Sequence, residues 1–307
     1  MMLAFGNPVY DSIKTPWVWT RDRVLSGCAT NAGLAFAKLG GDACVVGRVG
    51  TDRLDHYHKA LKCYRIGHHT ETCRETGGFK LDYDHQGRRE LDVLGQAEPI
   101  SQIPDSISRA GIVFIGPVLQ ETPFELIREV RSRTDAMMVL DPQGLLRRIG
   151  PGGRIEHFKP EGIENVCAGF DIVKPNELET EILTGVDPRQ DLDRAADILV
   201  GWGIPTVVIT LAELGALIVA EGRRYRIDAW PTLAADSTGA GDTFAGGLMY
   251  ARSRGMDWRA AGTMATAVAS MMIEQCGPEF ELTLQEVQRR AARVAVTERR
   301  AASAAVA

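Results

Sequence analysis

The run of residues that could most clearly perform chemistry is D-S-T-G-A-G-D-T-F at residues 236–244. Gly239, Ala240 and Gly241 are small and precede an apolar helical run. Their backbone N–H groups can therefore crowd together at a helix N-terminus, where the helix dipole also favours an anion. Asp242 would stand beside bound phosphate, a position that suits a base accepting the proton of an attacking hydroxyl group. On residue types alone, an ordinary helix N-cap without a ligand explains the run equally well.

A second polar run, K-P-N-E-L-E at residues 174–179, follows an expected strand at residues 171–173. Pro175 ends the strand, and Asn176 can cap the next helix. Glu179 stands three residues after Asn176, which is the spacing of a capping box. From the residues alone, this run therefore favours a structural interpretation.

Polar residues also follow two other expected strands. Asp11 lies just beyond the first strand, which begins at residues 3–5, and ligands in open α/β sheets bind at the carboxyl ends of the strands. A carboxylate there can accept hydrogen bonds from a polyol, although a solvated turn aspartate is an equal alternative. Gln143 comes shortly after the strand at residues 137–140, where it could contact a substrate or only shape the turn.

Short apolar runs alternate with helical segments along most of the chain. The runs at residues 43–46, 112–115, 137–140, 171–173 and 206–209 have the composition of strands buried on both faces. Helical patterns lie between several of them, for example at residues 122–133 and 176–183. This alternation predicts an α/β fold around a central, mostly parallel sheet.

Two stretches break this pattern, residues 14–24 and residues 69–94. The second stretch alternates polar and apolar residues and predicts three strands, with turns at Gly77–Gly78 and Gln86–Gly87. Alternation of this kind is typical of antiparallel strands with one solvated face. We expect the two stretches to form a small sheet that covers a site.

The remaining part of the chain predicts a helix after Glu281 that continues to about Arg293. Residues 299–307 are rich in alanine, and we expect a frayed tail there. The sequence therefore predicts one domain over residues 1–298.

Composition excludes several classes of protein. The formal net charge of −5 and the pI of about 5.8 argue against a nucleic-acid partner, which usually needs a basic face. The six cysteines form no CxxC pair, so neither a zinc site nor a disulfide framework is indicated. No apolar run approaches the roughly 20 residues that span a bilayer, and the N-terminal residues lack the basic lead of a signal peptide. We therefore expect a cytoplasmic protein without a membrane partner.

The run D-S-T-G-A-G-D-T-F resembles the C-terminal signature of the PfkB, or ribokinase-like, carbohydrate kinases. The run S-G-C-A-T-N at residues 26–31 is similar to the Gly-Gly-x-x-x-Asn element of the same family, with Ser26 in place of the first glycine. The resemblance extends from Phe5 to about Arg290. It implies a three-layer α/β/α core with a mostly parallel central sheet and a small β-sheet lid.

The resemblance also implies roles for individual residues. Gly239–Gly241 would form an anion hole for the transferring phosphoryl group, and Asp242 would be the catalytic base. Asp11, Gly27 and Asn31 would bind the substrate.

The resemblance implies less specific roles for several other residues. Gln143 would also bind substrate, because the D-x-Q step resembles the branch that includes inositol kinases and some archaeal nucleoside kinases. Glu179 would lie near a magnesium ion and act through water. Ala212 stands where the family usually has glycine. The residues expected to bind the nucleotide are Asn176, Thr210, Gly215 and Thr238.

The resemblance implies an ATP- and Mg²⁺-dependent kinase that transfers the γ-phosphoryl group to a hydroxyl of a small sugar or polyol, with an inositol-like acceptor among the candidates. A nucleoside kinase of the same family is one alternative. A non-catalytic nucleotide or metabolite sensor on this fold is another. An apolar lid face, expected from Trp17, Trp19, Phe79 and Tyr83, could also pair two copies of the chain as a homodimer.

Overall fold

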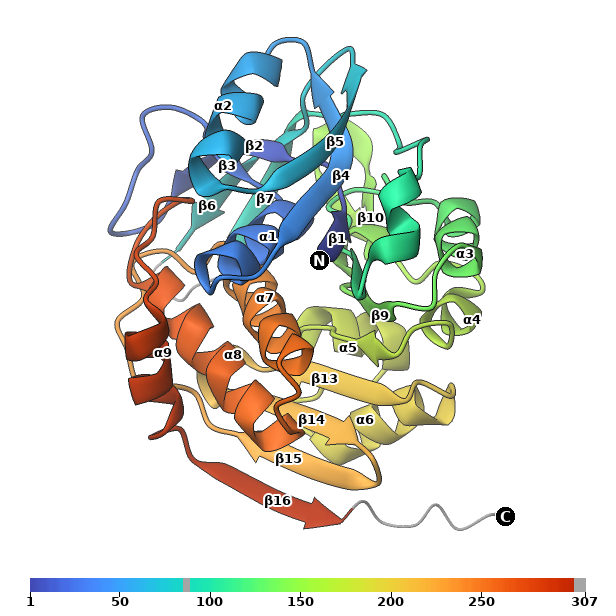
Figure 1. The fold of residues 1–307 in the computed structure, drawn as a ribbon, viewed down its shortest axis with the longest axis vertical. Helices are drawn as coiled ribbons and strands as arrows, with labels where there is room; N and C mark the ends of the chain where they lie inside the picture. The colour runs from blue at the N-terminus through green and yellow to red at the C-terminus, as the bar shows by residue number, and fades with distance from the viewer. Residues whose placement is uncertain (85–88, 301–307) are drawn as a thin grey trace.

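The computed structural model describes residues 1–84 and 89–300, and a ten-stranded sheet forms its centre (Figure 1). The strands β5-β4-β1-β8-β9-β12-β13 are neighbours in that order and run parallel. Strands β14, β15 and β16 continue the sheet beyond β13 in antiparallel pairs. The bounds are β1 Met2–Phe5, β4 Ala43–Gly50, β5 Gly67–Cys73, β8 Ile112–Ile115, β9 Met137–Leu140, β12 Ile172–Val173, β13 Thr206–Thr210, β14 Ala216–Ala220, β15 Arg223–Ile227 and β16 Val296–Arg300.

The central strands are buried on both faces, because their successive side chains enter two different hydrophobic cores. In β1, Met2 and Ala4 belong to one core, whereas Leu3 and Phe5 belong to the other. The expectation of short, doubly buried, parallel strands is confirmed.

Helices cover each face of the sheet and complete a three-layer α/β/α fold. One core includes buried side chains of α1 Cys28–Lys38, α2 Leu54–Tyr64, α7 Ala240–Ser253, α8 Trp258–Ile273 and α9 Leu284–Ala291. The other includes side chains of α3 Phe124–Ser132, α4 Ile163–Cys167, α5 Glu177–Thr184 and α6 Leu192–Gly201. Four short 3₁₀ segments connect elements in the described residues: η1 Asp105–Arg109, η2 Gln143–Leu146, η3 Pro151–Gly153 and η4 Ala212–Leu214.

Glycines allow the backbone to pack closely where the central strands end. A Cβ atom on Gly6, directly after β1, would lie 2.2 Å from the carbonyl oxygen of Gly116, which follows β8. A Cβ atom on Gly144 would lie 2.4 Å from the carbonyl carbon of Pro117. Neither position has room for a side chain, so the loops at this edge stack directly on one another.

The small sheet differs in part from the prediction. It has the order β3-β2-β6-β7, with β2 at Val9–Lys14, β3 at Val24–Ser26, β6 at Gly78–Tyr83 and β7 at Arg89–Gly95. Most of the predicted lid stretch 14–24 is therefore a connection between β2 and β3. Strand β2 pairs parallel with β6, whereas its pairing with β3 and the pairing of β6 with β7 are antiparallel. The predicted turn at Gln86–Gly87 lies outside the described residues.

Residues 69–73 were expected in the lid, but they belong to β5 in the large sheet. The alternating polar pattern of β5 arises because it is an edge strand whose side chains are largely accessible to solvent. No residue of β5 is fully buried on either face, so the predicted lid strand with one solvated face was wrong here. A further two-stranded pair, β10 Arg147–Ile149 and β11 Ile155–His157, follows η2.

The predicted helix after Glu281 is present as α9, but the chain does not fray directly afterwards. Strand β16 pairs with β15, so residues 299 and 300, expected in the frayed tail, are ordered in the sheet. Glu298 explains this in part, since it forms ion pairs with Arg223 and Arg259. The rest of the expected tail, residues 301–307, lies outside the described residues, and the single domain over residues 1–298 stays a prediction.

The connection between β2 and β3 exposes two large aromatic side chains, Trp17 and Trp19. Phe79, which was expected on the same exposed face, is buried. Of the helices in residues 1–84 and 89–300, none combines the length and apolar character that crossing a bilayer requires.

Candidate active site

The run at residues 236–244 turns into the N-terminus of α7. Gly239 is the N-cap residue and has a φ of 82°, a backbone conformation that favours glycine. The N–H of Thr238 donates to Asp236 Oδ1 at 2.9 Å, which fixes the turn before the helix. Ala240 and Gly241 form the first positions of α7. The N–H of Ala240 donates to the carbonyl of Ser237 at 3.2 Å, whereas the N–H of Gly241 has no acceptor within the helix. The run therefore lies at a helix N-terminus as expected, and anion binding there stays a prediction.

Asp242 lies in the first turn of α7 and contacts the N-terminal part of the chain. The side-chain amide of Asn31, from α1, donates to Asp242 Oδ2 at 3.0 Å and also lies 3.4 Å from Ser26 Oγ. Burial and the nearby carboxylate of Asp141 raise the pKa of Asp242, although the hydrogen bond from Asn31 opposes the shift. A raised pKa makes Asp242 a better proton acceptor than an exposed aspartate.

Lys174 is a residue of this site to which the sequence gave no role. Its Nζ lies 2.8 Å from Asp141 Oδ2, and both side chains are almost completely buried. A Cβ atom on Gly241 would lie 3.3 Å from the same Nζ, so the ammonium group borders the start of α7. Burial alone would lower the pKa of Lys174, but Asp141 and Glu179 more than offset it and raise the pKa above its usual range. In the sequence, the position of this lysine directly after a buried strand could have indicated its place in the site.

Asn176 and Glu179 form the capping box at the start of α5. Asn176 Oδ1 accepts from the N–H of Glu179 at 2.9 Å, and Glu179 Oε2 accepts from the N–H of Asn176 at 2.8 Å. Glu179 Oε1 accepts from the Asn176 side-chain amide at 2.7 Å. Burial and the charge of Asp141 raise the pKa of Glu179 to about 7, even though Lys174 opposes the shift. The structural interpretation of this run is confirmed.

The expected nucleotide side lies at the end of β13. The N–H of Thr210 donates to the carbonyl of Pro175 at 3.1 Å, which joins this strand end to the capping box segment. Gly215 has a φ of 83° after the 3₁₀ turn η4. Ala212 has a φ of 44°, a left-handed conformation that glycine would adopt more easily, which explains the preference for glycine there. Arg189 holds the turn by ion pairs with Glu177 and Glu213.

Asp11 and Gly27 occupy the junction between the core and the small sheet. Asp11 is buried in β2, and its Oδ1 accepts from the backbone N–H of Phe79 in β6 at 2.8 Å. Gly27 is the N-cap residue of α1 and has a φ of 114°. A Cβ atom on Gly27 would lie 2.9 Å from the carbonyl oxygen of Asn7, so the chain segments pack directly there.

Gln143 is half-buried in η2, two residues after Asp141. Its N–H donates to Asp141 Oδ1 at 3.1 Å. The backbone of Gln143 therefore helps to hold the carboxylate that pairs with Lys174. The sequence had left this role in the turn open as an alternative to substrate contact.

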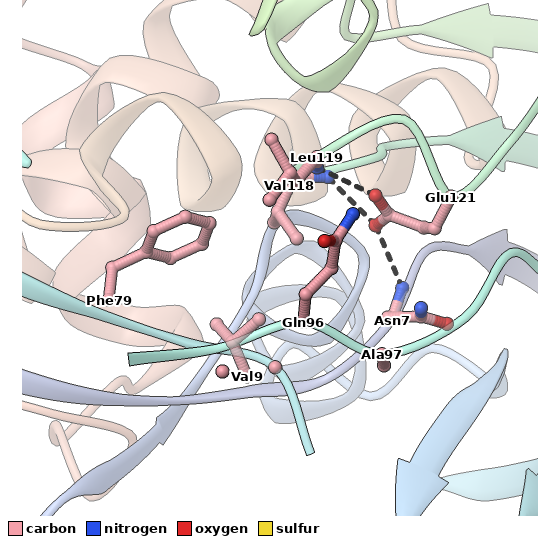
Figure 2. A pocket seen from close by; sticks show the side chains of 10 residues that line it. Asn7, Val9, Phe79, Gln96, Ala97, Val118, Leu119 and Glu121 are labelled. Carbon is pink, nitrogen blue, oxygen red and sulfur yellow. Dashed lines mark hydrogen bonds between the residues drawn. The ribbon is translucent and has the colours of Figure 1, made fainter. Parts of the chain in front are cut away.

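A narrow hollow with a cavity volume of only about 10 Å³ lies between the small sheet and the loop after β8 (Figure 2). Its walls are largely apolar. Glu121, at one end, is buried and accepts hydrogen bonds from the N–H groups of Asn7, Val118 and Leu119 at 3.0, 2.8 and 2.7 Å. Burial raises the pKa of Glu121. The residues that line the hollow are Asn7, Val9, Gly77, Phe79, Gly95, Gln96, Ala97, Val118, Leu119 and Glu121.

A second hollow, with a cavity volume of about 20 Å³, borders the turn at the N-terminus of α7. Ile13 and Val24 of the small sheet line it together with Asn31 and Thr238. Tyr83 of β6 makes a hydroxyl–hydroxyl contact with Thr238 at 3.0 Å. The small sheet therefore touches the turn that would bind phosphate, as a lid requires.

The chain matches known proteins over nearly its whole length. Residues 20–283 match the family model described as pfkB family carbohydrate kinase. A deoxyribokinase from Salmonella typhimurium is 33% identical over 267 residues, which covers 82% of each chain. A cytidine kinase from Thermococcus kodakarensis is 30% identical over 237 residues, covering 75% of this chain and 79% of the relative.

Solved structures of this fold are also similar. A pyrophosphate-dependent kinase of the ribokinase family, in a sulfate complex, superposes with a TM-score of 0.81 at 19% identity, covering 94% of this chain and 99% of the other. A ribokinase from Thermotoga maritima superposes with a TM-score of 0.74 at 21% identity, covering 95% and 99%. These likenesses show the ribokinase-like fold. The match over residues 20–283 shows more: the chain belongs to the pfkB family of carbohydrate kinases, phosphotransferases that act on hydroxyl groups.

Proposed function

We propose that the chain transfers the γ-phosphoryl group of ATP to a hydroxyl group of a small sugar, polyol or nucleoside, with Asp242 as the general base. One observation carries the proposal: the carboxylate of Asp242 is held by Asn31 at the N-terminus of α7, a helix end that favours an anion. An anion site with a positioned carboxylate beside it is the arrangement that phosphoryl transfer to a hydroxyl needs.

In the proposed reaction, Asp242 accepts the proton of the acceptor hydroxyl as its oxygen attacks the γ-phosphorus atom, and ADP leaves. The backbone N–H groups of Gly239–Gly241 stabilise the negative charge on the transferring group. The ammonium group of Lys174, beside Gly241, adds positive charge at the same place. Asp11, on the junction with the small sheet, would bind acceptor hydroxyls.

The residues around Glu179 fit a magnesium ion that acts through water. The donors there are oxygen atoms, which magnesium prefers. The carboxylate of Glu179 is buried with a raised pKa, so a nearby cation would stabilise its charged form. When bound, the ion would neutralise charge on the nucleotide phosphates, and Asn176 would orient Glu179 towards it.

Within this reaction, the lining of the hollow in Figure 2 favours a nucleoside as the acceptor over a free sugar or polyol. The small sheet would have to move to admit it, because the hollow as it stands holds only about 10 Å³. Val9, Phe79 and Leu119 give it apolar walls, and Glu121 already accepts three backbone hydrogen bonds. A polyol would leave buried hydroxyl groups unpaired there, which costs free energy. A flat base would instead bury apolar surface, and the exposed side chain of Gln96 could pair with its polar edge.

In the proposed complex, Asp11 would join this hollow to the reacting groups. Its Oδ1 accepts from the N–H of Phe79, whose ring lines the hollow, so the acceptor's hydroxyl end and its flat end would lie next to each other. The similarity to a cytidine kinase supports the same choice.

An ADP-release assay with MgATP tests the proposal against a panel of nucleosides, pentoses, hexoses and inositols, with Asp242→Asn as the inactive control. Nucleoside-dependent release that disappears in the variant supports the proposal. Release only with inositol or a pentose retains the kinase and overturns the nucleoside assignment. Nucleotide binding without turnover on any acceptor favours a sensor on this fold.

A further inference from the structure

Two hydrogen bonds tie the small sheet to the turn that begins α7. Tyr83, the last residue of β6, shares a hydrogen bond with Thr238, and the two hydroxyl oxygens lie 3.0 Å apart. Thr15, which directly follows β2, donates from its hydroxyl group to the carbonyl oxygen of Ala235 at 3.1 Å. The two contacts come from different segments of the small sheet and meet the two ends of residues 235–238.

The strands that carry these contacts are neighbours. Strand β2 pairs with β6 as far as Lys14 and Asp82, whose side chains form an ion pair at 3.2 Å. Thr15 Oγ1 also accepts from the N–H of Val18 at 2.9 Å, which fixes the start of the connection to β3. Tyr83 and Thr15 therefore lie at the same end of the small sheet, and both contact the turn there.

Residues 235–238 lead directly into the proposed phosphate site. Thr238 precedes Gly239, the N-cap residue of α7, and its N–H donates to Asp236 Oδ1 at 2.9 Å. Its side chain lines the second hollow together with Asn31, the residue that holds Asp242. A hydrogen bond to the Thr238 hydroxyl group therefore acts next to the groups that would hold the phosphoryl group.

The two hollows that the small sheet borders are nearly closed. The hollow in Figure 2 holds about 10 Å³ and the second about 20 Å³, so each has room for about one water molecule. Under the proposed function, the small sheet would have to move away from the turn to admit an acceptor. The contacts of Tyr83 and Thr15 would break on opening and form again on closing, so they belong to the closed arrangement.

We propose that Tyr83 is a positioning residue whose hydroxyl group holds the small sheet closed over residues 235–238, so that the phosphoryl group passes to the acceptor and not to water. This proposal rests on the proposed function. The ring of Tyr83 could cover the turn without its hydroxyl group. The hydrogen bond to Thr238 is therefore the property that phenylalanine would lack.

Water is the acceptor that a closed sheet would exclude. In the competing reaction, the oxygen of a water molecule forms the new bond to the γ-phosphorus atom and the bond to ADP breaks. The products are ADP, inorganic phosphate and a proton. Loss of one neutral hydrogen bond from the closed arrangement corresponds to an open population about fivefold larger.

Tyr83→Phe removes the hydroxyl group and keeps the ring. During turnover of MgATP with the panel acceptor that gives the fastest ADP release, the fraction of ADP accompanied by inorganic phosphate should rise about fivefold. A loss of stability alone would lower both products equally and leave this fraction unchanged. Tyr64→Phe is the matched control, because Tyr64 is also half-buried but lies in α2, which packs on the large sheet.

Hydrogen exchange without ligands tests the contact independently of activity. Peptides that cover β6 and residues 235–238 should exchange about fivefold faster in Tyr83→Phe, whereas β8 and the Tyr64→Phe control should not change. Thr238→Val removes the partner hydroxyl group and should speed exchange equally, and the double variant should add nothing further. Additive effects of the two substitutions, or unchanged exchange in both, would overturn the proposal.

The two measurements separate this proposal from the proposed function. If the unsubstituted chain releases no ADP with any acceptor, the kinase proposal fails, and the exchange data decide whether Tyr83 holds the sheet closed. If the chain is active and the phosphate fraction is unchanged in Tyr83→Phe, the role of Tyr83 is refuted and the kinase proposal stands.

Discussion

The two ends of the proposed acceptor site differ in the polarity of their side chains. At the reacting end, the charges of Asp141 and Lys174 are buried and that of Asp242 is half-buried, and each has a partner from a different element. At the far end, Val9 and Leu119 line a largely apolar hollow. Under the proposed function, the charged end would fix the chemistry, whereas the apolar end would select the acceptor.

The largest effect should come from the charged end. Asp242→Asn keeps the size and the contact with Asn31 but removes the base, so we expect kcat to fall by at least roughly 100-fold. The measurement is acceptor-dependent ADP release, with the urea unfolding midpoint as the control for folding. A folded variant with nearly normal turnover would exclude Asp242 as the base.

Lys174→Met tests whether the buried ammonium group also supports the fold. It leaves Asp141 buried without its partner, which should cost about 3–5 kcal/mol of unfolding free energy. Urea denaturation measures the loss. The double variant Asp141→Asn/Lys174→Met is the matched control, because it removes both charges and should recover part of the stability. Equal stability of the single variant and the unsubstituted chain would show that the pair is not coupled.

Leu119→Ala tests the apolar end. It should raise KM for a nucleoside about tenfold while changing kcat little, because it removes contact with the nucleobase and leaves the reacting groups in place. Leu126→Ala, in α3 and equally buried, controls for loss of stability without loss of the hollow. A fall in kcat at constant KM would mean that Leu119 acts on the chemistry, and the contrast between the two ends would fail.

A smaller effect should appear in the pH dependence of stability. The pKa of Glu179 is raised from 4.5 to about 7 in the folded chain, so the folded state binds more protons between these values. Unfolding free energy should therefore fall as pH rises through this window. Glu179→Gln can keep the capping bond from the N–H of Asn176, although it loses the bond from the Asn176 side-chain amide, and it should remove part of that slope, as measured by urea unfolding at pH 5 and pH 8. The exposed Glu161→Gln serves as control, and an unchanged slope in Glu179→Gln would contradict the raised pKa.

Much of the fold could be predicted because its central strands are short apolar runs that can be recognised from the local sequence. The apolar runs at residues 112–115 and 137–140 became β8 and β9 without change of bounds. The errors arose where a local pattern has two structural causes. The polar alternation of β5 reflects an edge of the large sheet, and β16 depends on pairing with β15, a strand about 70 residues earlier.

The site shows the same limit. The glycine turn and Asp242 form one continuous run, so sequence spacing alone marks them. Lys174 and Asp141 meet only because β9 and β12 are neighbouring parallel strands whose carboxyl ends coincide. Glu121 has no motif of its own, because its partners are backbone N–H groups of a loop and of Asn7. Such contacts depend on the completed sheet.

The close packing of Gly6 and Gly144 at the sheet edge limits how this chain could acquire a new substrate. Any side chain at these positions would collide with backbone atoms. We therefore expect glycine to be kept there both in natural variants and in variants selected from a directed-evolution library. The lining side chains Val9, Gln96 and Leu119 carry no such restriction. Diversity concentrated at these lining positions should therefore change acceptor preference while the reaction itself is inherited unchanged.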